Sequence, residues 1–140
     1  MTPVVVDSSV AMKWFVPEAH SDRALRLLDG TFELVAPDLL LPECGNALWK
    51  KISRGEIGLD DGRAIIQALG RAPIRIISSA ALVEAALEIA TAFRRTVYDG
   101  LFVALAVARE CPLITADERF VRAMADGPLS GNIRGLSGWS

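Results

Sequence analysis

Short apolar runs and longer stretches with helical periodicity alternate along the chain. The short runs are rich in Val, Ile and Leu, which predicts strands at Val4–Val6, Glu33–Ala36, Ile74–Ile77, Pro112–Thr115 and, more weakly, Asn132–Leu136. Apolar residues three or four positions apart predict helices at Ser9–Phe15, Ser21–Leu28, Asp38–Arg54, Leu59–Leu69, Ala80–Arg95, Asp99–Glu110 and Glu118–Ala125. This alternation favours an α/β fold, with an open parallel sheet covered by helices on both faces.

Two of the predicted helices differ in their expected surroundings. The Asp99–Glu110 helix is apolar on almost every side, which indicates that most of its surface is buried. The Ala80–Arg95 helix has a single apolar face, and its polar residues, Arg95 among them, are expected to face away from the core. The Asp99–Glu110 helix is therefore the predicted core helix.

Length and composition bound the class of protein. A chain of 140 residues fits one domain, and 51% hydrophobic against 23% charged residues excludes intrinsic disorder. Such an apolar composition in a small chain favours burial of some surface against a partner. The formal net charge of −2 provides no overall positive field, so any phosphate-bearing substrate must be held locally.

The sequence shows neither a membrane segment nor an export signal. The longest run without a charged residue, Gly100–Ala108, is far shorter than the roughly twenty residues of a membrane-spanning helix. Residues 1–15 lack a basic segment followed by an apolar one, which favours the cytoplasm. Cys44 and Cys111 have neither CxxC spacing nor a neighbouring His, so we expect two buried, reduced thiols.

Acidic residues are placed where a parallel sheet binds its ligands. Asp7 directly follows the first predicted strand, and Asp117 lies two residues beyond the fourth. Ligands of open parallel sheets bind outside the carboxyl ends of the strands, so both side chains are expected at one edge. Asp99 begins the core helix and Glu43 lies early in the Asp38–Arg54 helix, from which both can point to that edge.

Each of these acids also has a purely structural interpretation. Asp7 and Asp99 would serve as helix N-caps. Thr115 and Glu118 have the spacing of a capping box, which would leave Asp117 as a helix-dipole partner. Glu43 would be an ordinary acidic residue in the first turn of its helix.

A divalent cation would explain the four acids together. No Lys or Arg adjoins Asp7, Glu43 or Asp99 in the sequence, although Arg119 follows Asp117 closely. Clustered carboxylates without a cation repel and raise one another's pKa. Hard oxygen ligands select Mg²⁺ or Mn²⁺ over Zn²⁺, which prefers thiolate or imidazole.

Absent motifs narrow the chemistry further. His20 is the only histidine, which excludes a two-histidine ribonuclease mechanism, and neither GxxxxGK[ST] nor GxGxxG is present to bind a nucleotide. Asp7-Ser8-Ser9 lacks the second aspartate that an aspartyl-phosphate phosphatase would use. Metal-assisted hydrolysis of a phosphodiester, with a metal-activated water as nucleophile, fits what remains.

Four segments carry a resemblance to a known family: Val4–Ser9, Pro42–Leu48, Tyr98–Ala106 and Thr115–Phe120. In order and spacing they resemble the motifs of PIN-domain ribonucleases, specifically VapC-type toxins, across nearly the whole chain. The resemblance implies a three-layer PIN-like fold whose five-stranded parallel sheet has the order 3-2-1-4-5. It also implies a Mg²⁺- or Mn²⁺-dependent endoribonuclease that is neutralised by a VapB-type antitoxin.

The resemblance also implies roles for individual residues. Its acidic catalytic and metal-binding positions are matched by Asp7, Glu43, Asp99 and Asp117. Ser9 and Thr115 match supporting hydroxyls, and Asn46 matches a polar neighbour of the acidic positions. Val103 stands where some PIN proteins carry another acid, which favours one firmly held ion over two. Because VapC-type relatives commonly pair, we expect a two-fold homodimer.

Basic and aromatic residues are candidates for contacts with RNA or a partner. Arg119 is the best-placed basic residue for a substrate phosphate, although surface Arg and Lys are usually only solvated. Trp14, Phe15, Trp49 and Leu48 would line a groove for an amphipathic partner helix or stack an RNA base, or they are ordinary core residues.

Two further classes of function are compared with a toxin ribonuclease. A catalytically silent PIN scaffold that binds RNA or protein would be favoured if one of the four acids were missing, and none is. A phospho-acceptor receiver-like domain would need paired acids near the first strand and a lysine after the last one, and neither is present.

Overall fold

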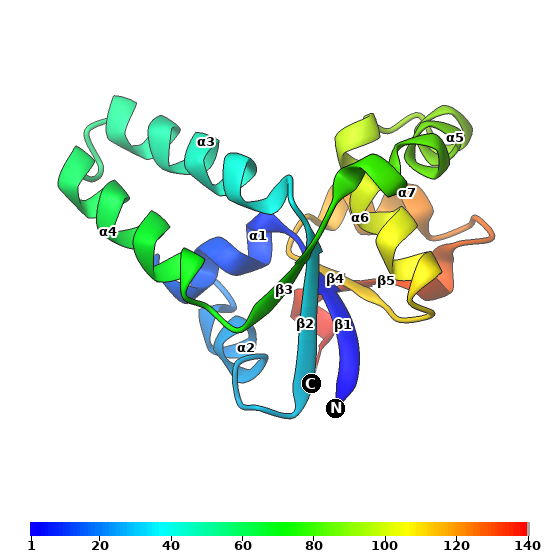
Figure 1. Ribbon diagram of the computed structural model, residues 1–140, viewed down its shortest axis with the longest axis horizontal. Helices are drawn as coiled ribbons and strands as arrows, with labels where there is room; N and C mark the ends of the chain where they lie inside the picture. Colours follow the sequence, from blue (N-terminus) through cyan, green and yellow to red (C-terminus); the bar gives the residue numbers. More distant parts are fainter. Residues whose placement is uncertain (140) are drawn as a thin grey trace.

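Five parallel strands form the centre of the molecule (Figure 1). The computed structural model describes residues 1–139, and its sheet has the strand order β3-β2-β1-β4-β5. The strands are β1 (Thr2–Val6), β2 (Phe32–Pro37), β3 (Ile74–Ile77), β4 (Leu113–Thr115) and β5 (Ile133–Gly135). The α/β fold and the strand order implied by the family resemblance are therefore confirmed.

Strand β1 lies in the middle of the sheet and has a neighbour on each side. Thr2 to Val5 pair in parallel with Phe32 to Val35 of β2. Val5 and Val6 pair with Leu113 and Ile114 of β4. Because β1 and β4 are parallel neighbours, the residues that follow each of them meet at the same edge of the sheet.

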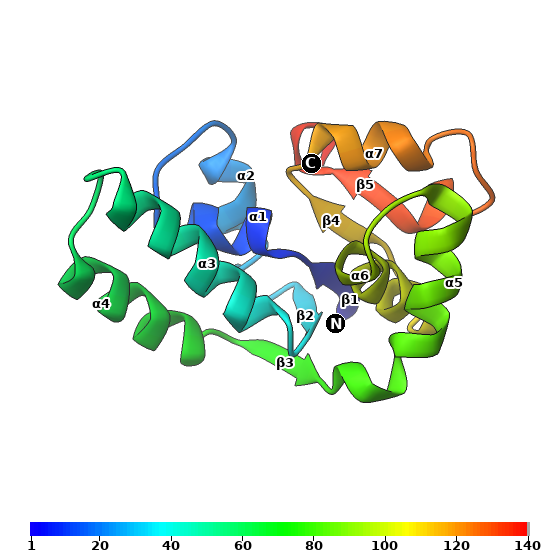
Figure 2. The same cartoon turned by 90° about the horizontal axis from the view of Figure 1, so that it is seen from above.

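Helices cover both faces of the sheet (Figures 1 and 2). Along one face run α1 (Ser8–Ala11), α2 (Ser21–Arg26), α3 (Leu40–Ser53) and α4 (Leu59–Gly70). The other face carries α5 (Val83–Phe93), α6 (Val97–Ala108) and α7 (Glu118–Met124). Helices α3 and α4 pack against each other and project from the sheet as a pair.

Two predicted helices are divided in the structure. The helix expected over Ser9–Phe15 consists of α1 and a 3₁₀ turn at Met12–Trp14. The helix expected over Ala80–Arg95 is preceded by a 3₁₀ turn at Ser79–Ala81 and ends at Phe93. It ends there because Arg94 has a left-handed backbone (φ 56°), and the N–H of Arg95 then donates to the Ala90 carbonyl.

Helix α6 is the buried core helix that the sequence predicts. Every residue from Gly100 to Ala106 is buried, including Val103, whose side chain is fully enclosed. Helix α5 packs closely on it at Gly100, where an added Cβ would lie 2.5 Å from the carbonyl oxygen of Ala86. This packing fixes the start of α6, and with it Asp99, relative to the sheet.

Trp14 is a core residue, so the core interpretation is confirmed for it and it does not line the groove predicted from Trp14, Phe15, Trp49 and Leu48. The Trp14 side chain is only 9% exposed, and its Nε1–H donates to the Ala24 carbonyl at 2.8 Å. Leu48 is also buried and Phe15 packs against the core. Trp49 alone of the four is largely exposed, at 60%.

Both cysteines are buried and neither forms a disulfide, as the sequence predicts. Burial raises the pKa of the Cys44 thiol to about 12, so it stays protonated at neutral pH. Within residues 1–139, the helices are too short and too polar for any of them to cross a membrane.

Candidate active site at the sheet edge

Asp7 is the most deeply buried of the four predicted acids. It follows β1 and caps α1, where its carboxylate accepts a hydrogen bond from the Val10 N–H at 3.3 Å. Burial raises the pKa of Asp7 to about 6, and the negative charge of Asp117 adds to that rise. The hydrogen bonds that Asp7 accepts lower its pKa. The capping interpretation is therefore confirmed for Asp7, but capping occupies only part of its carboxylate.

Two hydroxyl groups hold the Asp7 carboxylate in place. The Ser9 hydroxyl donates to its Oδ1 and the buried Thr115 hydroxyl donates to its Oδ2, both at 2.5 Å. Each hydroxyl also accepts a backbone N–H, from Ala116 for Ser9 and from Asp117 for Thr115. The end of β1 is thereby tied to the end of β4, so Ser9 and Thr115 support Asp7 as the family resemblance implies.

Asp117 is the N-cap of α7, which corrects the capping box predicted for Thr115 and Glu118. Its Oδ1 accepts from the N–H groups of Arg119 and Phe120, at 3.0 and 3.2 Å. Thr115 faces Asp7 instead, and the Glu118 carboxylate accepts from Ser137 at 2.8 Å. The sequence pattern was misleading because a threonine at the end of a buried strand lies too far inside to cap the helix.

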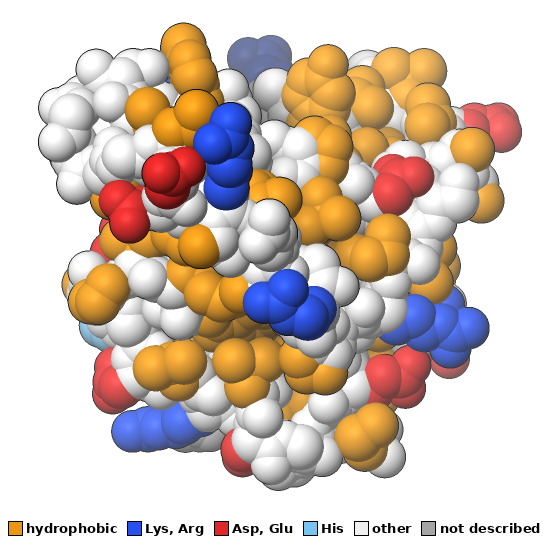
Figure 3. All heavy atoms as spheres, turned by 60° about the vertical axis from the view of Figure 1, so that its left-hand side comes forward, with side chains coloured by type: hydrophobic (Ala, Val, Ile, Leu, Met, Phe, Trp, Pro, Cys, Tyr) orange, Lys and Arg blue, Asp and Glu red, His pale blue; other side chains and the backbone are white. Residues whose placement is uncertain are grey.

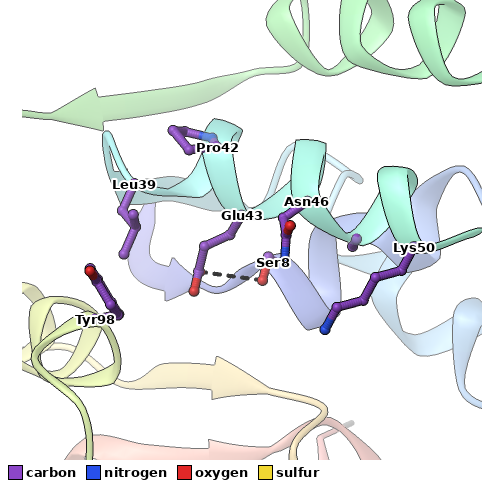
Figure 4. A pocket seen from close by; sticks show the side chains of 8 residues that line it. Ser8, Leu39, Pro42, Glu43, Asn46, Lys50 and Tyr98 are labelled. Carbon is purple, nitrogen blue, oxygen red and sulfur yellow. Dashed lines mark hydrogen bonds between the residues drawn. The ribbon is translucent and has the colours of Figure 1, made fainter. Parts of the chain in front are cut away.

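Glu43 reaches the same edge from the first turn of α3. Its Oε1 accepts a hydrogen bond from the Ser8 hydroxyl at 3.3 Å (Figure 4). Partial burial raises its pKa to about 7, and the negative charges of Asp7 and Asp99 contribute to that rise. Glu43 is thus electrostatically coupled to the other acids and titrates near neutral pH.

Asp99 lies in the first turn of α6, but it is not the N-cap that the sequence suggests. Thr96 is the N-cap, and its hydroxyl accepts the Asp99 N–H at 3.1 Å. The Asp99 carboxylate is free to face Arg95, whose Nη2 and Nε lie 2.9 and 3.1 Å from Oδ2. Burial raises the pKa of Asp99, while Arg95 lowers it.

Arg95 pairs with two of the four acids, which sequence reasoning did not predict. The guanidinium lies over the Phe120 ring at 4.7 Å and reaches Asp117 Oδ2 at 3.8 Å, in addition to Asp99. The expectation that Arg95 faces away is therefore wrong, because the left-handed turn at Arg94 directs the chain toward α6. Its spacing of four residues from Asp99 was the available signal.

The four carboxylates are suitable ligands for a hard divalent cation, but they are not arranged around a single metal-binding position. The negative charge of Asp117 contributes to the raised pKa of Asp7 and of Asp99, and Asp7 and Asp99 contribute to that of Glu43, so all four acids face a common region. Across residues 1–139, however, no three acidic, His or Cys side chains are positioned to hold one ion together. Oxygen ligands of this kind match Mg²⁺ or Mn²⁺, and binding would require side chains to turn toward the ion. Val103 has no carboxylate to add, and its side chain is buried in the core.

Two hollows flank the acids and share Ser8 and Ala47. One, of about 530 Å³, is lined in part by Glu43, Asn46, Lys50 and Tyr98. The other, of about 410 Å³, is lined by residues that include Lys13, Lys51 and Asp117. Asn46 therefore lies beside Glu43 as the resemblance implies, while Arg119 is exposed and meets the site through its backbone N–H.

Comparison with known proteins identifies the family. A model of the PIN domain matches residues 4–125, which is most of the chain. The chain belongs to the PIN domain family. Two relatives of this PIN domain are Ribonuclease VapC3 of Pyrobaculum aerophilum, 32% identical over 118 residues, and Ribonuclease VapC1 of Mycobacterium tuberculosis, 33% identical over 125 residues. The matches cover 83% and 88% of this chain, and 90% and 92% of the respective relatives.

Solved structures share the PIN fold at lower sequence identity. PAE2754 from Pyrobaculum aerophilum superposes with a TM-score of 0.72 at 21% identity, covering 97% of this chain and 85% of that one. A chain of VapBC2 from Rickettsia felis, solved bound to a DNA fragment from their promoter, superposes with a TM-score of 0.68 at 14% identity. The match covers 96% of this chain and 98% of that one. At these identities the likeness is one of fold.

Proposed function

We propose that this PIN domain is a Mg²⁺- or Mn²⁺-dependent endoribonuclease that hydrolyses RNA phosphodiesters. One observation carries the proposal: Asp7, Glu43, Asp99 and Asp117 converge at the carboxyl ends of β1 and β4, where neighbouring carboxylates contribute to the raised pKa of Asp7, Glu43 and Asp99. The similarity to proteins named ribonuclease, over more than four fifths of the chain, supports RNA as the substrate.

The acids would hold the ion, with Asp7 as the most firmly positioned of them. A divalent cation supplies an activated water and offsets the negative charge that develops on the phosphate oxygens. Ser9 and Thr115 keep the Asp7 carboxylate in one orientation, which lowers the cost of organising the site.

Glu43 is suited to proton transfer as well as to metal binding. Its pKa of about 7 lets the Oε atoms take up or release a proton near neutral pH. The Ser8 hydroxyl, 3.3 Å away, fixes one of those atoms at the edge of the hollow beside it. Glu43 is therefore our candidate for the group that accepts a proton from the attacking water.

A silent PIN scaffold that binds RNA or protein without cutting is the alternative. It is favoured by the Arg95 guanidinium between Asp99 and Asp117, and by the lack of three assembled metal ligands in the described part of the chain. Both candidate functions predict RNA binding, and only the first predicts cleavage that depends on a divalent ion.

Cleavage of a mixed RNA substrate with and without metal separates the two candidates. We expect cleavage in Mn²⁺, none in EDTA, and a loss of at least about two orders of magnitude in Asp7→Asn and in Asp99→Asn. Asp60→Asn is the matched control, because Asp60 is an exposed acid of α4 that pairs with Arg63. Full activity in EDTA, or in either site variant, would refute the metal-dependent mechanism.

We also propose that a VapB-type antitoxin neutralises the protein. An Arg or Lys of such a partner would be attracted to the four carboxylates, where it would compete with metal or substrate. An amphipathic helix of the partner would fit the groove between α3 and α4, a hollow of about 550 Å³ lined by residues that include Leu48, Trp49, Leu59 and Ile66. Figure 3 shows hydrophobic side chains gathered on the side of the molecule that carries these helices.

A further inference from the structure

The hollow next to Glu43 has features that the metal-binding chemistry does not require. Its 530 Å³ lies within the range of about 300–1,000 Å³ that is typical of small-molecule pockets. Its walls are formed by Leu39, Pro42, Ala47 and the ring of Tyr98, and polar groups are spaced between them. Figure 4 shows the Glu43 carboxylate among the side chains that line it.

One wall of the hollow is a single face of α3. Leu39, Glu43, Asn46 and Lys50 follow one another at intervals of three or four residues, which places them on the same side of the helix. The order runs from an apolar residue, through a carboxylate and an amide, to a cation. A ligand lying along this face would therefore meet an apolar, a hydrogen-bonding and a positively charged contact in turn.

Tyr98 forms the opposite wall and has no evident structural role there. It precedes Asp99 in the first turn of α6, and its side chain is 61% exposed although its neighbours in that helix form the core. Figure 4 places its ring across the hollow from Glu43 and next to Leu39. An exposed tyrosine in this position offers a flat aromatic surface within reach of the acids.

We propose that this hollow binds an unpaired nucleobase of the RNA strand next to the phosphodiester that is cut. The base stacks on Tyr98, its polar edge meets the Asn46 amide, and Lys50 at the outer end binds the adjoining phosphate. The inference rests on the proposed ribonuclease function and extends it to the recognition of a single-stranded nucleotide.

The chemistry of the hollow favours a base over other occupants. Unpaired bases in RNA are typically bound by stacking on aromatic side chains while their edges form hydrogen bonds. A free phosphate deep in the hollow would be repelled by Glu43, whereas base amino groups can donate to that carboxylate or to the Asn46 carbonyl. A base within a duplex is stacked and paired, so it cannot enter, and the site selects single strands.

The test measures binding without cleavage. A short single-stranded RNA that carries 2-aminopurine is titrated into protein with the Asp7→Asn substitution, and stacking is followed as fluorescence quenching. Loss of a base-stacking aromatic weakens single-strand binding substantially, so adding Tyr98→Ala should raise Kd about tenfold or more and abolish the quenching. Tyr98→Phe retains the ring and should retain both signals.

Val107→Ala is the matched control, because Val107 is an exposed apolar residue near the other end of α6, with 40% exposure. It should bind RNA with unchanged affinity. In otherwise wild-type protein, Tyr98→Ala should raise KM by a larger factor than it lowers kcat. It should also alter the preferred cleavage sites.

The outcomes separate this inference from the proposed function. If wild-type protein cleaves RNA but Tyr98→Ala matches Val107→Ala in Kd, quenching and cleavage sites, the base pocket is wrong and the ribonuclease stands. If Tyr98→Ala impairs only the binding of an antitoxin peptide, the hollow is a protein contact and the inference is equally overturned. If no metal restores cleavage but Tyr98-dependent quenching persists, the pocket stands and the chain is a binding scaffold.

Discussion

At the residue scale, the four carboxylates are held in different ways, and this determines how each would respond to a cation. Asp7 accepts a hydroxyl at each oxygen, and Asp117 caps a helix with one of its two. Asp99 is paired with Arg95, which is only 22% exposed in its side chain. Arg95 thus supplies positive charge at the position where a metal ion would also be attracted.

Removing that charge should make the protein more responsive to metal. In Arg95→Gln, Asp99 and Asp117 lose their counter-charge, so the melting temperature in EDTA should fall below that of wild type. Mn²⁺ should then raise the melting temperature by more than it does in wild type, because the ion no longer competes with a guanidinium. Thermal unfolding with increasing Mn²⁺ measures both effects.

Arg94→Gln provides the control for this prediction. Arg94 is the adjacent residue and is exposed, so its substitution should leave the response to Mn²⁺ unchanged. An equal rise in melting temperature for Arg95→Gln and wild type would mean that Arg95 does not oppose the ion.

The raised pKa values also predict how stability depends on pH in the metal-free protein. The folded-state values of Asp7 and Glu43 are about 6 and about 7, above the ordinary values of 3.8 and 4.5. The folded protein therefore binds these protons more tightly than the unfolded chain does. Their stabilising contribution is fully present below about pH 4 and is lost as the pH rises through 6 and 7.

Urea unfolding in EDTA at a series of pH values measures this contribution. The midpoint should decrease between about pH 4 and 7 in wild type, and the decrease should be smaller in Asp7→Asn and in Glu43→Gln. Saturating Mn²⁺ should oppose the decrease, because it stabilises the charged carboxylates. The same slope in wild type and in both variants would assign the pH dependence to other groups.

At the element scale, the contact between α5 and α6 sets the position of Asp99. Helix α6 begins where α5 turns back, and Gly100 allows the two backbones to approach closely. A side chain at Gly100 would collide with the Ala86 backbone rather than with a flexible side chain. The two helices would have to separate, and the collision lies one residue from a proposed metal ligand.

Gly100→Ala and Gly45→Ala should therefore change stability in opposite directions. We expect Gly100→Ala to destabilise the fold by about 1–3 kcal/mol or more, as overpacking does. In Gly45→Ala the new Cβ meets nothing within 4 Å inside α3, so the helix should gain up to about 1 kcal/mol. Urea unfolding of both variants checks the pair, and a neutral Gly100→Ala would show that α5 adjusts without cost.

Most elements, but not every contact between them, could be predicted from the sequence. Asp7 and Asp117 were placed together because both follow predicted strands of a parallel sheet, and that reasoning needs no side-chain geometry. The contacts of Arg95 with the acids were missed because α5 ends in a left-handed turn at an arginine, where a glycine would have marked the end. Trp14 was ambiguous because periodicity within a short helix does not show how much of it neighbouring elements cover.

At the scale of the whole molecule, exposed apolar residues occur on two separate helical surfaces. The α3–α4 groove exposes Trp49, Leu59 and Ile66, at 60%, 55% and 36%. Helix α5 exposes Val83 and Leu87, which lie four residues apart on one face. We expect the groove to bind the antitoxin and the α5 face to bind a second copy of the chain.

Substitutions on the two surfaces should separate the two interactions. Trp49→Ala should weaken binding of a co-expressed antitoxin while the protein remains a dimer. Leu87→Glu should produce a monomer that still binds the antitoxin. Light scattering at tens of micromolar and copurification measure these outcomes. A monomeric wild type, or antitoxin binding unaffected by Trp49→Ala, would contradict the corresponding assignment.

The central position of β1 has a consequence for protein synthesis. The Asp7 carboxylate depends on a hydroxyl that lies 108 residues further along the chain, on a strand that pairs beside β1 only after β2 and β3 have been made. A nascent chain that has not yet reached Thr115 has Asp7, our proposed metal ligand, and Ser9, but it lacks both the Thr115 hydroxyl and Asp117. The order of strands in the sheet therefore determines when, during translation, a complete site first exists.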